Sequence, residues 1–150
     1  MTDKKFISKT AAQLQIGDRA ETEYTVTEED LRKFAEISGD WNPLHFDEVY
    51  AKKSIFRQRI AHGLISLAKF SGIFGTKLPG EGTLWETQEV RFLAPVFINK
   101  IYRAIALVIE KNERRVTFQT WVEDENGVHV LDGRGVVLPI TENFRKRLGV

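Results

Sequence analysis

Residues 61–77 read AHGLISLAKFSGIFGTK, and this stretch decides the fold. Its apolar residues lie almost all round a helical wheel, which predicts a buried helix rather than a surface one. They are Leu64, Ile65, Leu67, Ala68, Phe70, Ile73 and Phe74. Three glycines, Gly63, Gly72 and Gly75, each weaken helix propensity by roughly 1 kcal/mol relative to alanine. Glycines make sense where a helix lies close against a flat surface, so we expect a sheet beside it.

Extended segments follow the helix after a break at residues 78–83, LPGEGT. The expected strands are about 83–92, 100–111, 114–124 and 127–139. In the second of these, one face carries Ile101, Ile105, Leu107 and Ile109. The turn signals KNER and DENG separate the last three strands, and the Asn-Gly pair makes the second signal strong. An antiparallel meander wrapped around one long apolar helix predicts an α+β fold with a strongly curved sheet.

The chain before the long helix is expected to be irregular and rich in helix. Residues 20–30, AETEYTVTEED, begin as a strand and turn into a helix near Thr27. Thr27 and Asp30 have the spacing of a capping box. Gly39 is a natural helix end, because glycine accepts the left-handed conformation just beyond a helix. A short helical turn is expected around residues 47–54.

The bulk composition describes an ordinary globular protein. The 150 residues are 42% hydrophobic and 29% charged, so we expect one soluble domain over residues 1–150 with its core at about 12–140. The net charge of +1 argues against wholesale nucleic-acid binding. The absence of cysteine excludes disulfides, thiolate nucleophiles and zinc–thiolate sites. The N-terminus has no signal-peptide pattern, and no stretch approaches ~20 apolar residues. No membrane partner and a cytoplasmic location are therefore expected.

One short loop gathers groups that can do chemistry. Residues 39–45 read GDWNPLH, in which the Asn-Pro pair favours a turn but the histidine is not needed for one. A carboxylate at Asp40 and an imidazole at His45 could hold one water on a stiff loop. One group would take a proton from it and the other would deliver a proton elsewhere. A plain turn with a surface histidine explains the same residues, so local chemistry leaves both interpretations open.

The start of the long helix offers a second polar feature. Backbone N–H groups at a helix start lack partners within the helix, and the dipole there is positive. Gly63 has no side chain to block approach, so its N–H could bind a substrate carbonyl that gains negative charge during the reaction. Alternatively, Gly63 only allows close packing and His62 caps the helix.

Four quoted stretches together resemble a known family. They are residues 34–47, FAEISGDWNPLHFD; 60–75, IAHGLISLAKFSGIFG; 78–83, LPGEGT; and 90–97, VRFLAPVF. In this combination they are similar to the MaoC-like (R)-specific enoyl-CoA hydratases of the hot-dog fold, over about residues 26–139. The G-D-x-N-P-L-H motif is specific when an A-H-G helix follows at this distance.

The resemblance implies a fold, a reaction and a site. A central helix would be wrapped by an antiparallel sheet, and two subunits would pair into a homodimer or a dimer of dimers. The reaction would be reversible syn addition of water to a trans-2-enoyl-CoA, giving an (R)-3-hydroxyacyl-CoA. Asp40 and His45 would be the catalytic pair, and the Gly63 N–H would hold the thioester carbonyl. Asn42, grouped with the substrate-binding residues, would shape the loop and orient the pair rather than carry protons, and Ser71 is a weaker substrate-binding candidate. No cofactor is implied beyond the coenzyme A of the substrate.

Some features bear on the substrate carrier. Four basic residues lie between the acid–imidazole loop and the long helix, and a basic rim there could bind the phosphates of coenzyme A or an acidic acyl carrier protein. They are Lys52, Lys53, Arg57 and Arg59. A cluster of solvated charges is the simpler interpretation. The same applies to the basic C-terminal residues Arg145, Lys146 and Arg147.

Two further sets of residues bear on the pocket and on a turn. Possible pocket walls are Leu64, Leu67, Phe70 and Phe74. Asn99-Lys100 stands where many relatives have Gly-Asp, and we expect a turn there with an altered bend.

Other functions share the same features. The hot-dog fold also hosts thioesterases, and fold alone does not define function. An acid and an imidazole on one loop favour hydration over hydrolysis, for which a carboxylate on the helix is expected. A 3-hydroxyacyl-carrier-protein dehydratase of fatty-acid synthesis would run the same chemistry in reverse. A non-catalytic acyl-thioester-binding module would have no use for the pair. No metal is expected, because the three histidines His45, His62 and His129 lack ligand spacing in the sequence.

Overall fold

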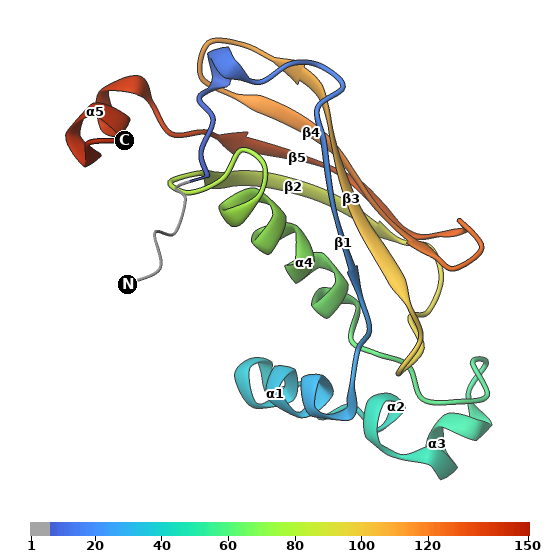
Figure 1. The fold of residues 1–150 in the computed structure, drawn as a ribbon. Helices are drawn as coiled ribbons and strands as arrows, with labels where there is room; N and C mark the ends of the chain where they lie inside the picture. Colours follow the sequence, from blue (N-terminus) through green and yellow to red (C-terminus); the bar gives the residue numbers. More distant parts are fainter. Residues whose placement is uncertain (1–6) are drawn as a thin grey trace.

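The computed structural model describes residues 7–150, and its largest element is a five-stranded antiparallel sheet (Figure 1). The strands are β1 Arg19–Tyr24, β2 Leu84–Phe92, β3 Tyr102–Lys111, β4 Val116–Asp124 and β5 His129–Leu138. They lie in the order β1-β3-β4-β5-β2. The α+β class and the five extended segments are therefore confirmed. The simple meander is wrong in one respect, because only β3, β4 and β5 follow one another across the sheet. The strand β2 lies beside β5 at the opposite edge from β1, and the chain crosses the sheet to reach β3.

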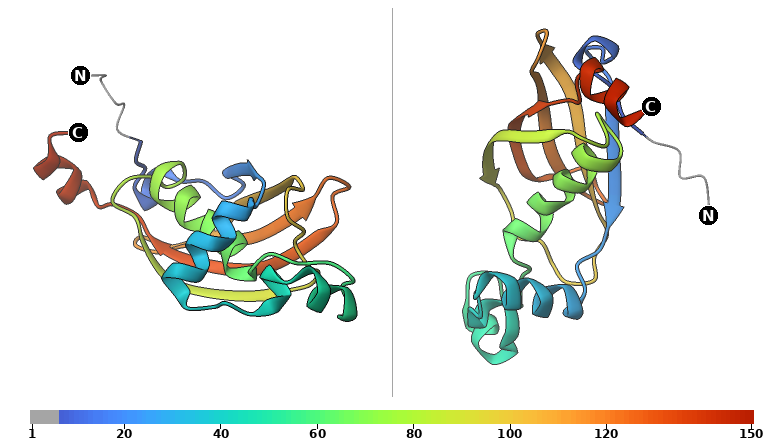
Figure 2. Two further views of the ribbon diagram at one scale, coloured as in Figure 1. Left: turned by 90° about the horizontal axis from the view of Figure 1, so that it is seen from below. Right: turned by 90° about the vertical axis from the view of Figure 1, so that its left-hand side faces the viewer.

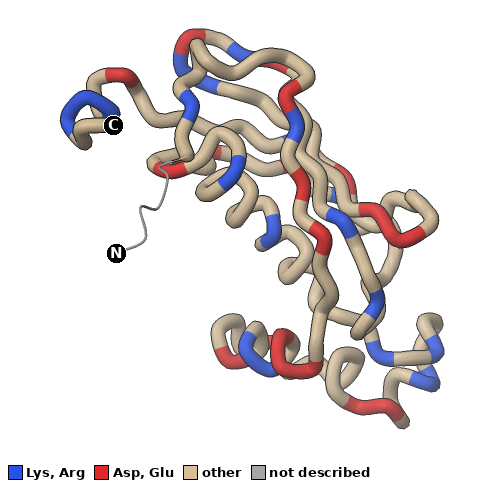
Figure 3. The backbone as a smooth tube through the Cα atoms, in the orientation of Figure 1, with Lys and Arg blue, Asp and Glu red and all other residues tan. Residues whose placement is uncertain are grey.

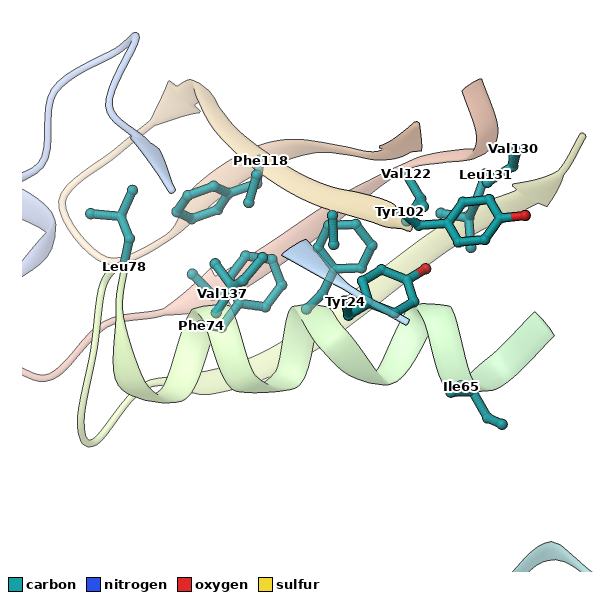
Figure 4. Close-up of a cluster of buried hydrophobic side chains, with 14 of the residues drawn as sticks. Tyr24, Ile65, Phe74, Leu78, Tyr102, Phe118, Val122, Val130, Leu131 and Val137 are labelled. Atoms are coloured by element: carbon teal, nitrogen blue, oxygen red, sulfur yellow. The ribbon is translucent and has the colours of Figure 1, made fainter. Parts of the chain in front are cut away.

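The long helix α4, Gly63–Thr76, lies across the concave face of the sheet, as Figures 1 and 2 show. Its side chains Phe70, Ile73 and Phe74 are almost fully buried. The ring centroid of Phe74 lies 5.0 Å from that of Phe118 on β4. Figure 4 shows this cluster between helix and sheet. Burying each of these large apolar side chains stabilises the fold by about 1.5–3 kcal/mol.

Burial all round the helix was predicted, and it is wrong for this chain. Leu64, Ala68, Ser71 and Gly72 are exposed along one face of α4. Close packing does not explain two of the helix glycines, because a Cβ atom at Gly72 or Gly75 would meet nothing within 4 Å. Only Gly63 is in close contact, where a Cβ atom would lie 2.6 Å from Cε1 of Phe92.

Small residues on the inner face let the sheet curve around the helix. On β3 the buried inward side chains include Ala104 and Ala106, whereas Ile105, Leu107 and Ile109 alternate with them on the outer face. On β5 the inner positions include Gly133, where a Cβ atom would clash with the Glu89 carbonyl oxygen at 1.9 Å. The pairs β2–β5, β4–β5 and β3–β4 each contain a shift in register. Such irregularities bend the strands further.

Three short helices form a layer beyond the N-terminal end of α4 (Figures 1 and 2). They are α1 Glu28–Ser38, α2 Pro43–Phe46 and α3 Glu48–Lys53. The capping box at the start of α1 is confirmed, since the Thr27 hydroxyl accepts from the Asp30 amide and the Asp30 carboxylate accepts from the Thr27 amide. Gly39 ends α1 in the left-handed conformation, with φ 77°, as expected. We call residues 27–59 the helical overhang.

Near the termini lie a 3₁₀ helix, Ala11–Gln13, and the helix α5, Glu142–Leu148. Arg145 on α5 is not simply solvated, because its guanidinium donates to the Gln13 side chain at 3.0 Å. The expected turn at Asn99 is present, with φ 61° and its N–H bonded to the Val26 carbonyl. Among residues 7–150, no helix combines the length and the apolar character needed to cross a membrane.

Candidate active site

Asp40 and His45 lie on the helical overhang, Asp40 in the loop before α2 and His45 within α2. The Asp40 carboxylate accepts from the Asn42 amide at 3.1 Å, and the Asn42 side chain in turn accepts from the Leu44 amide at 3.0 Å. Pro43 occupies the first turn of α2, where its missing N–H costs nothing. Asn42 therefore acts as the cap of α2 and shapes the loop, in line with the loop role expected for it.

His45 is buried, with 7% of its surface exposed. Its Nδ1 lies 2.7 Å from the Ile60 carbonyl oxygen, which can only accept, so Nδ1 carries the hydrogen in the neutral ring. Its other nitrogen, Nε2, then has a free lone pair and lies 3.6 Å from Oδ2 of Asp40. That separation is too long for a direct hydrogen bond. The two acceptors are therefore close enough to share one donor that lies to the side of the line joining them.

The first turn of α4 is next to this pair. Gly63 begins the helix, so its N–H has no partner within the helix. Gly63 and His45 both line one cavity of about 430 Å³. The cavity walls are mostly apolar and also include Phe56, Ile60, Leu64, Ser66, Phe92 and Leu131. The sequence-predicted Gly63 and His45 are thus brought together, with Asp40 beside them.

Tyr24 and Ser66 form a buried hydroxyl pair beside the cavity that was not predicted. The Tyr24 hydroxyl donates to Ser66 Oγ at 2.6 Å. Burial raises the pKa of Tyr24 to about 12, so the phenol stays protonated at neutral pH. The sequence offers no signal for this pair, because the two residues are far apart in the chain and neither is unusual in its surroundings.

Several predicted site residues are not part of this cavity. Ser71 is exposed on the outer face of α4, and its role in substrate binding stays a prediction. Of the four suggested walls, only Leu64 lines the cavity. Phe70 and Phe74 point instead into the core between helix and sheet, because the inward face of α4 beyond its first turns is filled by strand side chains.

Arg59 does not belong to a free basic rim. Its guanidinium forms an ion pair with Glu28 of α1, donates to Glu48 of α3 at 2.8 Å and reaches the His45 carbonyl at 3.3 Å. These hydrogen bonds raise the pKa of Arg59, with that to Glu28 the largest cause. Lys52, Lys53 and Arg57 remain exposed on α3 and the loop after it, where Figure 3 shows a group of basic residues.

His62 is the residue that sequence reasoning missed most clearly. It is the N-cap residue of α4, as suggested, but its side chain makes no capping hydrogen bond. Its ring is 2% exposed and stacks on the ring of His45, with centroids 3.8 Å apart. Its Nε2 lies 3.0 Å from the Asp40 carbonyl oxygen. Desolvation lowers the pKa of His62 below its ordinary value.

The fold also corrects the argument about histidine spacing. One ligand atom each from Asp40, His45 and His62 lies within 4.8 Å of the others, although His45 and His62 are well separated in sequence. Imidazole lone pairs lie in the ring plane, and these two stacked planes are inclined by only 30°. Such lone pairs do not converge on one ion at bonding distance. We therefore assign no metal to this cluster, and the expectation of no metal stays a prediction.

A curved antiparallel sheet around one central helix, with an acid–imidazole pair beside the helix start, is the arrangement of a hot-dog protein. The model of the MaoC like domain matches residues 10–129, and the chain belongs to that family.

Its relatives carry related names. An (R)-specific enoyl-CoA hydratase of Rhodospirillum rubrum is 36% identical, over 81% of this chain and 85% of the relative. A mitochondrial 3-hydroxyacyl-[acyl-carrier-protein] dehydratase of Arabidopsis thaliana is 34% identical, over 89% of this chain and 82% of the relative. The structure of an unliganded R-hydratase from Pseudomonas aeruginosa superposes with a TM-score of 0.83 at 38% identity, covering 89% of this chain and 86% of that one.

Proposed function

We propose that this chain is an (R)-specific hydratase that adds water to a trans-2-enoyl-CoA and forms an (R)-3-hydroxyacyl-CoA. The observation that carries the proposal is the pair of acceptor atoms, Asp40 Oδ2 and His45 Nε2, 3.6 Å apart beside Gly63. Membership of the MaoC-like family and the hydratase names among the relatives support it. The reaction is reversible, so the chain also catalyses dehydration of the product.

The two acceptors suit a water that donates a hydrogen to each of them. A water about 2.8 Å from both atoms fits their separation. Its oxygen lone pair is then free to attack C3 of the substrate. The oxygen–C3 bond forms while the C2–C3 π pair moves toward the thioester carbonyl, and one water proton passes to the Asp40–His45 pair. The pair returns a proton to C2 on the same face, so the addition is syn and both groups end as they began.

Gly63 stabilises the charge that develops in this step. Its N–H points from the positive end of α4 and donates to the thioester oxygen, a bond that strengthens as the enolate forms. The apolar cavity beside it accommodates the acyl chain and excludes water from the enolate. Any side chain at this position would displace the Phe92 ring that lines the cavity.

Coenzyme A is the proposed carrier. Lys52, Lys53 and Arg57 are exposed on the overhang, where they are free to contact phosphates at the cavity mouth. A second candidate, dehydration of a 3-hydroxyacyl carrier protein, is favoured by the Arabidopsis relative. The same basic residues suit an acidic carrier protein, so the carriers compete for one surface. A cytoplasmic location belongs to the same proposal.

We also propose that two copies pair through the β2 edge of the sheet. The β1 edge is blunted by alternating charges at Arg19, Glu21 and Glu23. The β2 edge continues into exposed apolar residues, with Phe92 54% and Leu93 48% exposed. The exposed face of α4 lies on the same concave side of the sheet. Exposed apolar surface of this kind is typical of subunit contacts.

Absorbance of crotonyl-CoA tests the function directly. Hydration removes the enoyl absorbance without release of free thiol, and the product is the (R) isomer. Release of free thiol would instead make the protein a thioesterase. No change in either signal, with bound substrate, would make it a binding module. A parallel assay with one enoyl thioester of an acyl carrier protein decides the preferred carrier by comparison of kcat/KM.

A further inference from the structure

We infer that His62 is a positioning residue for the proposed hydratase reaction. It holds Asp40 and His45 in their relative positions through one hydrogen bond and one ring stack. This inference rests on the proposed function. It assigns a role to a buried imidazole that touches both members of the pair but is not itself turned toward the cavity, since His62 is absent from the residues that line it.

The hydrogen bond determines which nitrogen of His62 carries hydrogen. Its Nε2 lies 3.0 Å from the backbone carbonyl oxygen of Asp40, and a carbonyl oxygen only accepts. Nε2 must therefore be the N–H. Its Nδ1 is buried with no hydrogen-bond partner among the described residues. Protonation there would bury an unsatisfied donor and a charge, so the ring is held neutral.

The stack connects this neutral ring to His45. The two ring centroids are 3.8 Å apart at an interplanar angle of 30°. Phe34 of α1 and Phe46 of α2 close the other sides of His62, with centroids at 4.8 and 5.9 Å. These two rings carry no charge, so the titratable groups that face His62 are Asp40 on the loop and His45 on α2. The orientation of His45 is thus fixed by Ile60 at one nitrogen and by His62 at its face.

The arrangement links α4 to the loop that carries Asp40. Asp40 is exposed, and among the described residues its side chain accepts one hydrogen bond, the local one from the Asn42 amide. A bond from His62 to its backbone is the contact that ties this loop to the start of the central helix, where Gly63 binds the thioester. Because a displacement of about 1 Å can cost on the order of 10²-fold in rate, this bond can set kcat without touching substrate.

A tautomer measurement tests the geometry independently of activity. The chain has only three histidines, so long-range ¹H–¹⁵N spectra of the imidazoles are simple to assign. At pH 7 we expect the Nε2–H tautomer for His62 and the opposite Nδ1–H tautomer for His45. A protonated His62 at pH 7, or an Nδ1–H tautomer for it, would overturn the inference.

Variants test the consequence for catalysis. His62→Gln keeps an N–H donor near the Nε2 position, whereas His62→Phe keeps a stacking ring but loses the donor. We expect His62→Phe to lower kcat by about tenfold or more with KM changed less than about twofold, and His62→Gln to recover much of the loss. His129→Gln, on the exposed end of β5, serves as the matched control and should leave both constants unchanged.

Equal kcat for wild type and His62→Phe, with both folded by circular dichroism, would contradict the inference. If the Phe variant does not fold, a His62→Gln variant as inactive as His62→Ala would contradict it instead. Failure of the proposed function is a different result, because the wild-type protein itself would then not hydrate crotonyl-CoA.

Discussion

The lone pair at Nε2 of His45 exists because a backbone carbonyl occupies its other nitrogen. The hydrogen bond from Nδ1 to the Ile60 oxygen leaves Nε2 as an acceptor facing the Asp40 carboxylate. In the proposed mechanism, a water that donates to both atoms is the nucleophile. Two acceptors opposed in this way are costly in a folded protein unless a donor lies between them, which is typical of a functional site rather than a structural one.

Removing either acceptor should therefore stop the reaction without unfolding the protein. We expect Asp40→Asn and His45→Gln each to lower kcat for crotonyl-CoA hydration by about 10²–10⁴-fold, the range for loss of acid–base help. Steady-state kinetics measures the effect, and His129→Gln is the control for imidazole loss elsewhere. Turnover within a few fold of wild type in either variant would refute the assignment of the pair.

The depressed pKa of His62 predicts how stability depends on pH. Its folded-state pKa lies below the ordinary value of 6.5, so the unfolded chain binds a proton more readily. The contribution of neutral His62 to the free energy of unfolding is therefore fully present above pH 6.5. It is lost as the pH falls from 6.5 through the folded-state pKa. Urea unfolding at a series of pH values should show a smaller acid loss in His62→Gln than in wild type. An identical pH dependence in the two proteins would argue that His62 titrates normally.

Among the elements, the first and last helices of the helical overhang are joined by one arginine. Arg59 joins Glu28 at the start of α1 to Glu48 at the start of α3, and it also reaches the carbonyl of His45. Both glutamates lie in the first turns of their helices, where negative charge is favoured by the dipole. These Arg59 contacts, which we call the Arg59 clamp, span the loop that bears Asp40 and His45, the proposed catalytic pair.

Loss of the Arg59 clamp, the contacts of its guanidinium with Glu28, Glu48 and the His45 carbonyl, should affect turnover and stability together. We expect Arg59→Ala to lower the melting temperature and to lower kcat by about tenfold, because the loop between α1 and α3 becomes less ordered. Arg57→Ala, two residues away and exposed, is the matched variant. It should leave the melting temperature and kcat unchanged and raise KM for enoyl-CoA, more strongly at low salt. The opposite assignment of effects would show that Arg59, not Arg57, contacts the carrier.

For the whole molecule, the single chain leaves two features incomplete. The sheet has a free edge at β2, and α4 exposes one face that includes Leu64 and Ala68. A helix buried all round was the expectation from its sequence, and a second subunit over this face would restore that burial.

A charge on that face distinguishes a dimer from a monomer. We expect wild-type protein to sediment as a dimer at micromolar concentration and Ala68→Glu to shift it toward monomer, because the new carboxylate would lose its water in the contact. Ala12→Glu, at an exposed alanine of the 3₁₀ helix, should remain a dimer. A monomeric wild-type protein would contradict the β2-edge interface, and an Ala68→Glu variant that stays dimeric would show that the exposed face of α4 takes no part in the contact. The single-domain organisation over residues 1–150 also stays a prediction.

Local patterns in the sequence determined the elements of this fold. Apolar periodicity predicted α4 and the strands, the Thr27–Asp30 spacing predicted the start of α1, and the αL preference of glycine predicted its end at Gly39. Each of these depends on residues a few positions apart, so the amino-acid order suffices. The loop from Asp40 to His45 was recognised for the same reason.

Only the tertiary structure decided which elements are neighbours and what surrounds the site. The placement of β2 beside β5, the pairing of Tyr24 with Ser66, and the stack of His62 on His45 join residues far apart in the chain. The isoleucines of β3 point outward because the inward positions, where α4 lies closest, hold small residues. Such contacts arise from packing of the whole chain at high density, and no local periodicity encodes them.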